Sequence, residues 1–306
     1  MKIYTITLNP AYDVHANLKS LELGCENLAE VTRRDAGGKG INISRALTFN
    51  GVENTAIVVL GEDNCTDFEN SLRVDNITYI GIKKHGRIRE NLTVHAESGE
   101  TRISFSGFTL DSSVLDEISE HIIADENTIV TFTGSVPKGI GMAEIKRFLA
   151  DLSSRGAKTV IDSRSFTLAD LVEVKPWLIK PNGEEITVYS GKRVSDFSDC
   201  IDFVRVLNGE GIKNIMVSLG EKGALLVTDG NAIVATPLKI EALSTIGAGD
   251  SMIAGFVTAY SMGISPEECL RTAVSYGTAA CLLEGTTSPT HESIAQIHQN
   301  VIVKKL

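Results

Sequence analysis

Short runs of consecutive apolar residues alternate along this chain with longer stretches in which apolar residues recur at helical spacing. A short continuous apolar run is typical of a strand that is buried on both faces of a parallel sheet. Such strands are predicted at residues 57–60, 128–132, 159–162, 178–180, 215–218 and 224–227, and helices at 113–124, 142–155, 197–209, 252–262 and 266–284. The alternation predicts an α/β fold in which helices cover both faces of a mainly parallel sheet.

The pattern changes between about residues 77 and 105, where apolar and polar residues alternate as in a half-exposed strand. Residues 91–96 and 101–105 read as two such strands, and the Glu-Ser-Gly-Glu between them is a hairpin signal. Taken alone, this segment is consistent with an ordinary hairpin on the surface. No repeat, proline-rich linker or low-complexity segment divides the chain, which predicts a single domain of residues 1–306.

A glycine-rich segment at 244–251 leads directly into the predicted helix at 252–262. Free amides at a helix start attract anions, and Gly247 and Gly249 let a phosphate approach the main chain without meeting a Cβ. Asp250 follows at once, where it repels phosphate but is well placed to take a proton from a hydroxyl that attacks one. This pattern indicates kinase chemistry, while the alternative is a glycine-rich loop whose aspartate only caps the helix.

A second glycine-rich segment, at 35–46, also runs into a helical pattern. It carries a cation, Lys39, and an amide, Asn42, which together suit a substrate that has a negative group and hydroxyls. The alternative is a flexible turn. Neither segment has the spacing G-x-x-x-x-G-K-[ST] or the strand-linked G-x-G-x-x-G, so the chemistry of a P-loop or a Rossmann dinucleotide site is not predicted.

Five motifs in the same order resemble the ribokinase-like sugar kinases, the PfkB carbohydrate kinases. They lie at residues 37–42, 133–137, 180–185, 218–224 and 244–250, and the last is similar to the family signature D-T-x-G-A-G-D with Ser244 in place of the first Asp. The resemblance covers nearly the whole chain. It implies a ribokinase-like three-layer sandwich with a small β lid, formed here by about residues 12–34 and 77–108.

Within that family, residues 8–13, Lys39 and the R-x-N element from Arg89 to Asn91 are similar to the branch that acts on sugar phosphates, the 1-phosphofructokinases and tagatose-6-phosphate kinases. Thr93 departs from the lysine that is frequent in 1-phosphofructokinases, and Ser-Gly-Phe at 106–108 replaces a Pro-Gly-Pro. The resemblance implies phosphorylation of fructose 1-phosphate to fructose 1,6-bisphosphate. Tagatose 6-phosphate is the alternative substrate, and a non-catalytic relative that binds a sugar phosphate is a less favoured one.

The resemblance also implies a set of site residues. Asp250 would be the catalytic base beside the turn of Gly247, Ala248 and Gly249; the sugar phosphate would contact Asp13, Gly38, Lys39, Asn42, Arg89, Asn91 and Ser135; ATP would contact Lys180, Asn182, Ser218, Gly220, Gly223 and Gly249. Glu185 would act on Mg²⁺ through water, because Mg²⁺ gives up its water reluctantly. The alternative for Glu185 is an acid that favours the first turn of a helix.

Composition and net charge limit the binding partners and the cellular compartment that are expected for the protein. The formal net charge of −10 repels polyanions, so neither nucleic acid nor a membrane is expected as a partner. Five cysteines without C-x-x-C spacing indicate reduced thiols. The N-terminus reads as a strand and not as a signal peptide, and no stretch has the ~20 apolar residues of a membrane span. A cytoplasmic enzyme is expected, and the resemblance implies a homodimer that pairs through the lid.

Overall fold

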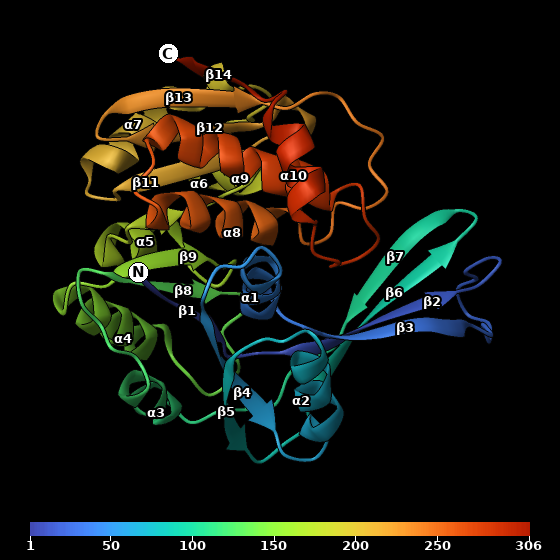
Figure 1. Ribbon diagram of the computed structural model, residues 1–306. Helices are drawn as coiled ribbons and strands as arrows, with labels where there is room; N and C mark the ends of the chain where they lie inside the picture. The colour runs from blue at the N-terminus through green and yellow to red at the C-terminus, as the bar shows by residue number, and fades with distance from the viewer.

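A ten-stranded sheet forms the body of the computed structural model, which describes residues 1–306 (Figure 1). From one edge to the other, its strands are β14 (Ile302–Lys305), β13 (Asn231–Thr236), β12 (Ala224–Thr228), β11 (Asn214–Ser218), β10 (Leu178–Ile179), β9 (Lys158–Asp162), β8 (Thr128–Thr133), β1 (Lys2–Thr7), β4 (Thr55–Gly61) and β5 (Tyr79–Lys84). Neighbouring strands from β5 to β11 are parallel, and the pairings from β11 to β14 are antiparallel. The predicted mainly parallel sheet is confirmed.

Helices cover both faces of this sheet (Figure 1). One face carries α1 (Lys39–Phe49), α2 (Cys65–Val74), α8 (Ala248–Ser261), α9 (Pro266–Ala280) and α10 (His291–His298). The other carries α3 (Val114–Glu120), α4 (Met142–Ser154), α5 (Leu168–Val174), α6 (Gly183–Ser190) and α7 (Ile201–Gly209). Successive strand residues such as Val160 and Ile161 enter opposite core clusters, as side-chain alternation requires. The result is the predicted three-layer sandwich.

The predicted helices differ from the observed ones mainly at their ends. The helix predicted at 252–262 begins four residues earlier, at Ala248, because Gly247 takes up a left-handed conformation and ends the preceding turn there. The helix predicted at 197–209 is divided into a 3₁₀ turn, Phe197–Asp199, and α7. A carboxylate oxygen of Asp199 accepts hydrogen bonds from the amides of Ser195 and Asp196, which closes the first turn separately.

A second, four-stranded sheet projects from the side of the body (Figure 1). Its order is β3 (Glu30–Gly37), β2 (Ala11–Asn17), β6 (Arg89–Ala96) and β7 (Gly99–Ser104), and we call it the small sheet. The predicted hairpin is its β6–β7 pair. The prediction that the lid begins at residue 77 was wrong for its first part, because β5 pairs in parallel with β4 at the edge of the main sheet.

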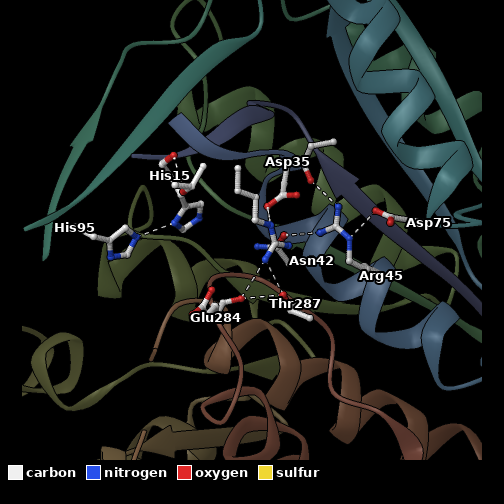
Figure 2. A network of polar contacts seen from close by, with 11 residues as sticks. His15, Asp35, Asn42, Arg45, Asp75, His95, Glu284 and Thr287 are labelled. Carbon is white, nitrogen blue, oxygen red and sulfur yellow. Dashed lines mark hydrogen bonds and ion pairs between the residues drawn. The ribbon is translucent and has the colours of Figure 1, made fainter. Parts of the chain in front are cut away.

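A side-chain contact joins the small sheet to the body, and another joins two of its own strands. Nη1 of Arg33 on β3 donates to Oγ1 of Thr287, 2.9 Å away, in the loop that follows α9. His15 on β2 and His95 on β6 stack on one another, with Nδ1 of the first 3.1 Å from Nε2 of the second (Figure 2). The Arg33 contact fixes the small sheet beside the loop after α9, and the histidine contact joins β2 to β6 within the sheet. None of the helices combines the length and the apolar composition that a membrane span requires.

Candidate active site

One large cavity, of about 800 Å³, lies between the main sheet and the small sheet. Residues at the carboxyl ends of the parallel strands line it, which is where ligands gather in open α/β sheets. All the residues for which the sequence predicted a role in the site line this cavity, from Asp13 on β2 to Asp250 on α8. Segments that are far apart in the sequence therefore meet at one place.

The glycine-rich turn before α8 forms one wall of the cavity. Gly247 has φ +76°, and the helix begins at the next residue. The first amides of a helix have no partner within it; that of Ala248 donates to the carbonyl oxygen of Thr245, which leaves those of Gly249 and Asp250 as the natural anion contacts of this wall. A Cβ at Gly249 would lie 2.9 Å from Nζ of Lys180, so a side chain there would displace the end of the lysine from the turn.

The carboxylate of Asp250 is buried, with 6% of the residue exposed, and faces α1. Its Oδ2 accepts a hydrogen bond from Nδ2 of Asn42 at 2.9 Å. Burial raises the pKa of Asp250 to about 6; the positive charge of Lys39 opposes this rise and the negative charge of Asp162 adds to it. A carboxylate with a pKa near neutrality is suited to accept a proton from a hydroxyl.

Two lysines flank a second buried carboxylate, that of Asp162 at the end of β9. Nζ of Lys39 lies 2.7 Å from Oδ2 of Asp162, and Nζ of Lys180 lies 3.8 Å from the same oxygen. Burial opposes ionisation of Asp162, but the two lysines hold its pKa below the ordinary value. Burial likewise opposes the charge of Lys39, and the attraction of Asp162 and Asp250 raises its pKa. Both lysines line the cavity.

A second cluster of polar residues lies on the small sheet. Oδ1 of Asp13 accepts hydrogen bonds from Nδ2 of Asn91 at 2.8 Å and from Nη2 of Arg102 at 3.2 Å. Nη1 of Arg89 donates to Oδ1 of Asn91 at 2.9 Å, while its buried Nε has no partner. Burial lowers the pKa of Arg89, the charge of Asp13 raises it and that of Arg102 lowers it. Arg102 thus contacts Asp13 directly and Arg89 reaches it through Asn91, so two cations accompany one carboxylate and this end of the cavity is cationic.

The sequence did not single out Arg102. It lies on β7, directly opposite Thr93 of β6 in the strand register. Asn9 was named only as part of a motif, and its Nδ2 donates to Oγ of Ser135 at 2.8 Å. In both cases the partner is distant in the sequence, so no local spacing could have revealed the contact.

The predicted nucleotide side of the cavity comes from β10, α6 and the turn after β11. Gly220 and Gly223 both have positive φ, and a Cβ at Gly223 would lie 2.0 Å from the carbonyl oxygen of Ala235. Asn182 and Glu185 form a capping box: each side chain accepts a hydrogen bond from the amide of the other residue. The structure therefore shows Glu185 in the role given as its alternative, an acidic residue in the first turn of a helix.

No group of three or more His, Cys, Asp or Glu side chains is arranged so that it could hold a metal ion by itself. Asp162 and Glu185 both line the cavity near Lys180. This donor set fits Mg²⁺ bound mainly by phosphate oxygens and water, because Mg²⁺ keeps much of its water shell.

The model of the pfkB family carbohydrate kinases matches residues 6–293 of the chain. The chain belongs to this family. Its members use ATP together with a divalent metal ion, and the chain is accordingly an ATP-dependent sugar kinase.

Relatives of known name match over almost their whole length. The 1-phosphofructokinase of Haemophilus influenzae is 33% identical, over 89% of each chain, and that of Escherichia coli K12 is 31% identical, over 91% of this chain and 90% of the other. A crystal structure of phosphofructokinase-2 from Escherichia coli with substrates and products superposes with a TM-score of 0.91 at 26% identity, over 98% of this chain and 99% of that one. The ribokinase-like fold is confirmed.

Proposed function

We propose that the chain phosphorylates a ketose phosphate, and that its substrate is fructose 1-phosphate. The observation that carries this proposal is the pair of cations at the small-sheet end of the cavity: Arg102 contacts Asp13, and Arg89 is linked to it through Asn91. Their charge exceeds that of the one carboxylate between them, which favours a ligand with a phosphate of its own. The names of the 1-phosphofructokinase relatives support the same substrate.

Catalysis in this proposal is mainly a matter of position and charge. The hydroxyl of the sugar attacks the γ-phosphorus of ATP, the bond to ADP breaks, and the hydroxyl proton passes to the carboxylate of Asp250. Because the transition state of phosphoryl transfer is loose, amides and cations supply much of the stabilisation. The amides at the start of α8, together with Lys39 and Lys180, would supply it here.

Lys39 was predicted to hold the existing phosphate of the sugar together with Arg89. Its contact with Asp162 and its attraction to Asp250 support a place beside the transferred phosphoryl group instead. The ATP would lie along Asn182, Ser218, Gly220 and Gly223, and Mg²⁺ would neutralise charge on its phosphates, with Glu185 acting through water.

The decisive experiment measures ADP release from Mg²⁺-ATP with fructose 1-phosphate, tagatose 6-phosphate, fructose 6-phosphate and unphosphorylated fructose. We expect the highest kcat/KM with fructose 1-phosphate. A preference for tagatose 6-phosphate would keep the mechanism and select the alternative substrate. Binding of ATP without turnover of any of these sugars would support the non-catalytic alternative.

We also propose a homodimer that pairs through the small sheet. This sheet and the β2–β3 connection carry apolar side chains that are open to solvent, among them Leu23 and Leu28 with 93% and 94% exposed, and Val31, Ile103 and Phe105. Such a group of exposed apolar residues is typical of an interface. A closed lid also fits the chemistry, because transfer to a sugar rather than to water requires water to be excluded.

The dimer is tested by light scattering after size-exclusion chromatography. We expect twice the chain mass of 32.9 kDa at micromolar concentration, and a shift towards the monomer in Val31→Glu, which places a charge in the interface. Ile302→Glu is the matched control, since Ile302 is a strand residue with 59% exposed, against 61% for Val31, at the far edge of the main sheet. A monomeric wild-type protein would contradict the proposal.

A further inference from the structure

Arg45 is a buried cation that lies behind the cavity and does not line it. It is on α1, and only 9% of the residue is exposed. Nε donates to Oδ2 of Asp75 at 2.8 Å, just after α2, and Nη2 donates to the carbonyl oxygen of Ala36 at 2.6 Å, on β3 (Figure 2). The carboxylate and the carbonyl hold the guanidinium group in one orientation, because its donors form a rigid planar fork.

The third nitrogen of this guanidinium group, Nη1, points towards the candidate active site. Nη1 of Arg45 donates to Oδ1 of Asn42 at 3.3 Å, and Nδ2 of the same amide donates to Oδ2 of Asp250 at 2.9 Å. An amide has one end that accepts and one end that donates. A donor fixed behind the oxygen therefore decides that the nitrogen, and not the oxygen, faces the carboxylate of Asp250.

We propose that Arg45 is a positioning residue for the catalytic base: it fixes the orientation of the Asn42 amide and so supplies a hydrogen-bond donor to Asp250. The inference rests on the proposed role of Asp250 as the base. Without Arg45, the amide can turn its oxygen towards the carboxylate, and an acceptor there repels the ionised form that catalysis needs.

The consequence is a change in the pH at which the base loses its proton. The groups that face Asp250 are Lys39 of α1, Lys180 after β10 and Asp162 of β9, together with the amide of Asn42. Burial raises the pKa of Asp250, and the hydrogen bond from Asn42 lowers it. Loss of that bond raises the pKa further, so the fall of activity on acidification moves to higher pH.

The test is the pH profile of kcat/KM for Arg45→Met, measured with the sugar that the wild-type protein turns over best. We expect the acid limb of this profile, in which kcat/KM falls as the pH is lowered, to move up by about 0.5 to 1 pH unit. This is the size of shift that follows from loss of one hydrogen bond to a carboxylate. The activity should therefore fall several-fold more at pH 6 than at pH 8. An unmoved limb, with an equal loss at all pH values, would overturn the inference.

Two further variants separate this role from a structural one. If Arg45 acts through the amide, Arg45→Met has no further effect on the acid limb in an Asn42→Ala background, and additive shifts would overturn the inference. Arg271→Met is the matched control, since Arg271 on α9 also pairs its Nε with a carboxylate, that of Glu268 at 3.0 Å, and donates to the carbonyl oxygen of Val301. We expect its acid limb to be that of the wild type.

Arg45→Lys, together with a direct titration of the Asp250 carboxyl group, tests the inference even if Arg45→Met does not fold or no sugar is turned over. Arg45→Lys keeps a charge for Asp75, but one ammonium group cannot reach Ala36 and Asn42 as well, so a shift in the same direction is expected even if Arg45→Met does not fold. The carboxyl carbon of Asp250, labelled with ¹³C and assigned by comparison with Asp250→Asn, should titrate at higher pH in either variant. This measurement needs no substrate, so an unmoved titration overturns the inference whether or not the proposed reaction is found.

Discussion

Replacement of Asp250 by asparagine is expected to lower kcat by about 10²- to 10⁴-fold, the range for loss of a general base. Asparagine has nearly the same shape and can still contact Asn42, so the cavity should keep its form. The amide cannot take the proton of the sugar hydroxyl, while the amides of the turn and the lysines still bind ATP. KM for ATP should therefore change little. A variant that keeps most of its kcat would remove Asp250 from the role of base.

The same substitution is expected to stabilise the fold at neutral pH. The pKa of Asp250 is raised in the folded protein from the ordinary value of 3.8 to about 6, so ionisation costs more in the folded chain than in the unfolded one. This cost is absent below pH 3.8, grows as the pH rises, and is fully present above pH 6. Asparagine removes it, and the gain in the free energy of unfolding reaches up to about 3 kcal/mol.

Denaturation by urea at pH 7.5 and at pH 4 measures this gain. The variant should exceed the wild type at pH 7.5, and the difference should shrink towards zero at pH 4. Asp202→Asn is the matched control, because Asp202 also lies in the first turn of a helix but its side chain is 95% exposed. No comparable gain is expected there. A loss of stability at pH 7.5 in Asp250→Asn would contradict the assigned cost of the buried charge.

The inner strands β4, β8, β9, β10, β11 and β12 of the main sheet could be predicted because they are buried on both faces, which leaves a continuous apolar run in the sequence. The position of Asp250 behind the glycine-rich turn could be predicted because the glycines and the helix start that define its surroundings are its neighbours in the chain. The β5 strand was assigned to the lid because an alternating pattern describes an edge strand of either sheet equally well. The strand with which β5 pairs decides between the two sheets, and that pairing depends on the rest of the fold.

Other parts of the site could not be predicted for a similar reason. Arg102 lies in an alternating hairpin, where an arginine reads as a solvent-facing charge, and only the β2–β6–β7 pairing brings it to Asp13, 89 residues away in the sequence. Arg45 lies on α1, the helix that carries Lys39 and Asn42, but outside the motif at residues 37–42. Its partner Asp75 follows a different helix, α2. For Glu185, the sequence pattern of a helix cap and that of a metal contact are the same.

Replacement of Arg102 by glutamine is expected to raise KM for the sugar phosphate about 10- to 100-fold. A hydrogen bond to a charged group contributes about 1.5–3 kcal/mol, and each 1.4 kcal/mol corresponds to about a factor of 10 in affinity. Asp13 keeps its hydrogen bond from Asn91 in the variant, so its carboxylate stays paired. KM for ATP should stay near the wild-type value, because the nucleotide side lies across the cavity on other elements.

Arg34→Gln is the matched control for this prediction. Arg34 is on the same small sheet but does not line the cavity; its Nη2 lies 3.0 Å from Oε1 of Glu90 and its guanidinium group lies over the ring of Tyr12. The two variants change the charge of the sheet equally, so a general loss of electrostatic attraction would raise KM in both. We expect the large increase in Arg102→Gln alone.

Unphosphorylated fructose separates the two roles that Arg102 can have. If the arginine binds the phosphate, its loss affects the phosphorylated ketose and leaves the low activity with fructose unchanged, and Arg102→Lys recovers part of the affinity because a point charge keeps the attraction but not the two-pronged contact. If Arg102 only orients Asp13 towards the sugar hydroxyls, both substrates lose equally and lysine offers no selective recovery. The ratio of the two kcat/KM values is therefore the quantity to compare, and we expect it to fall about 10- to 100-fold in Arg102→Gln.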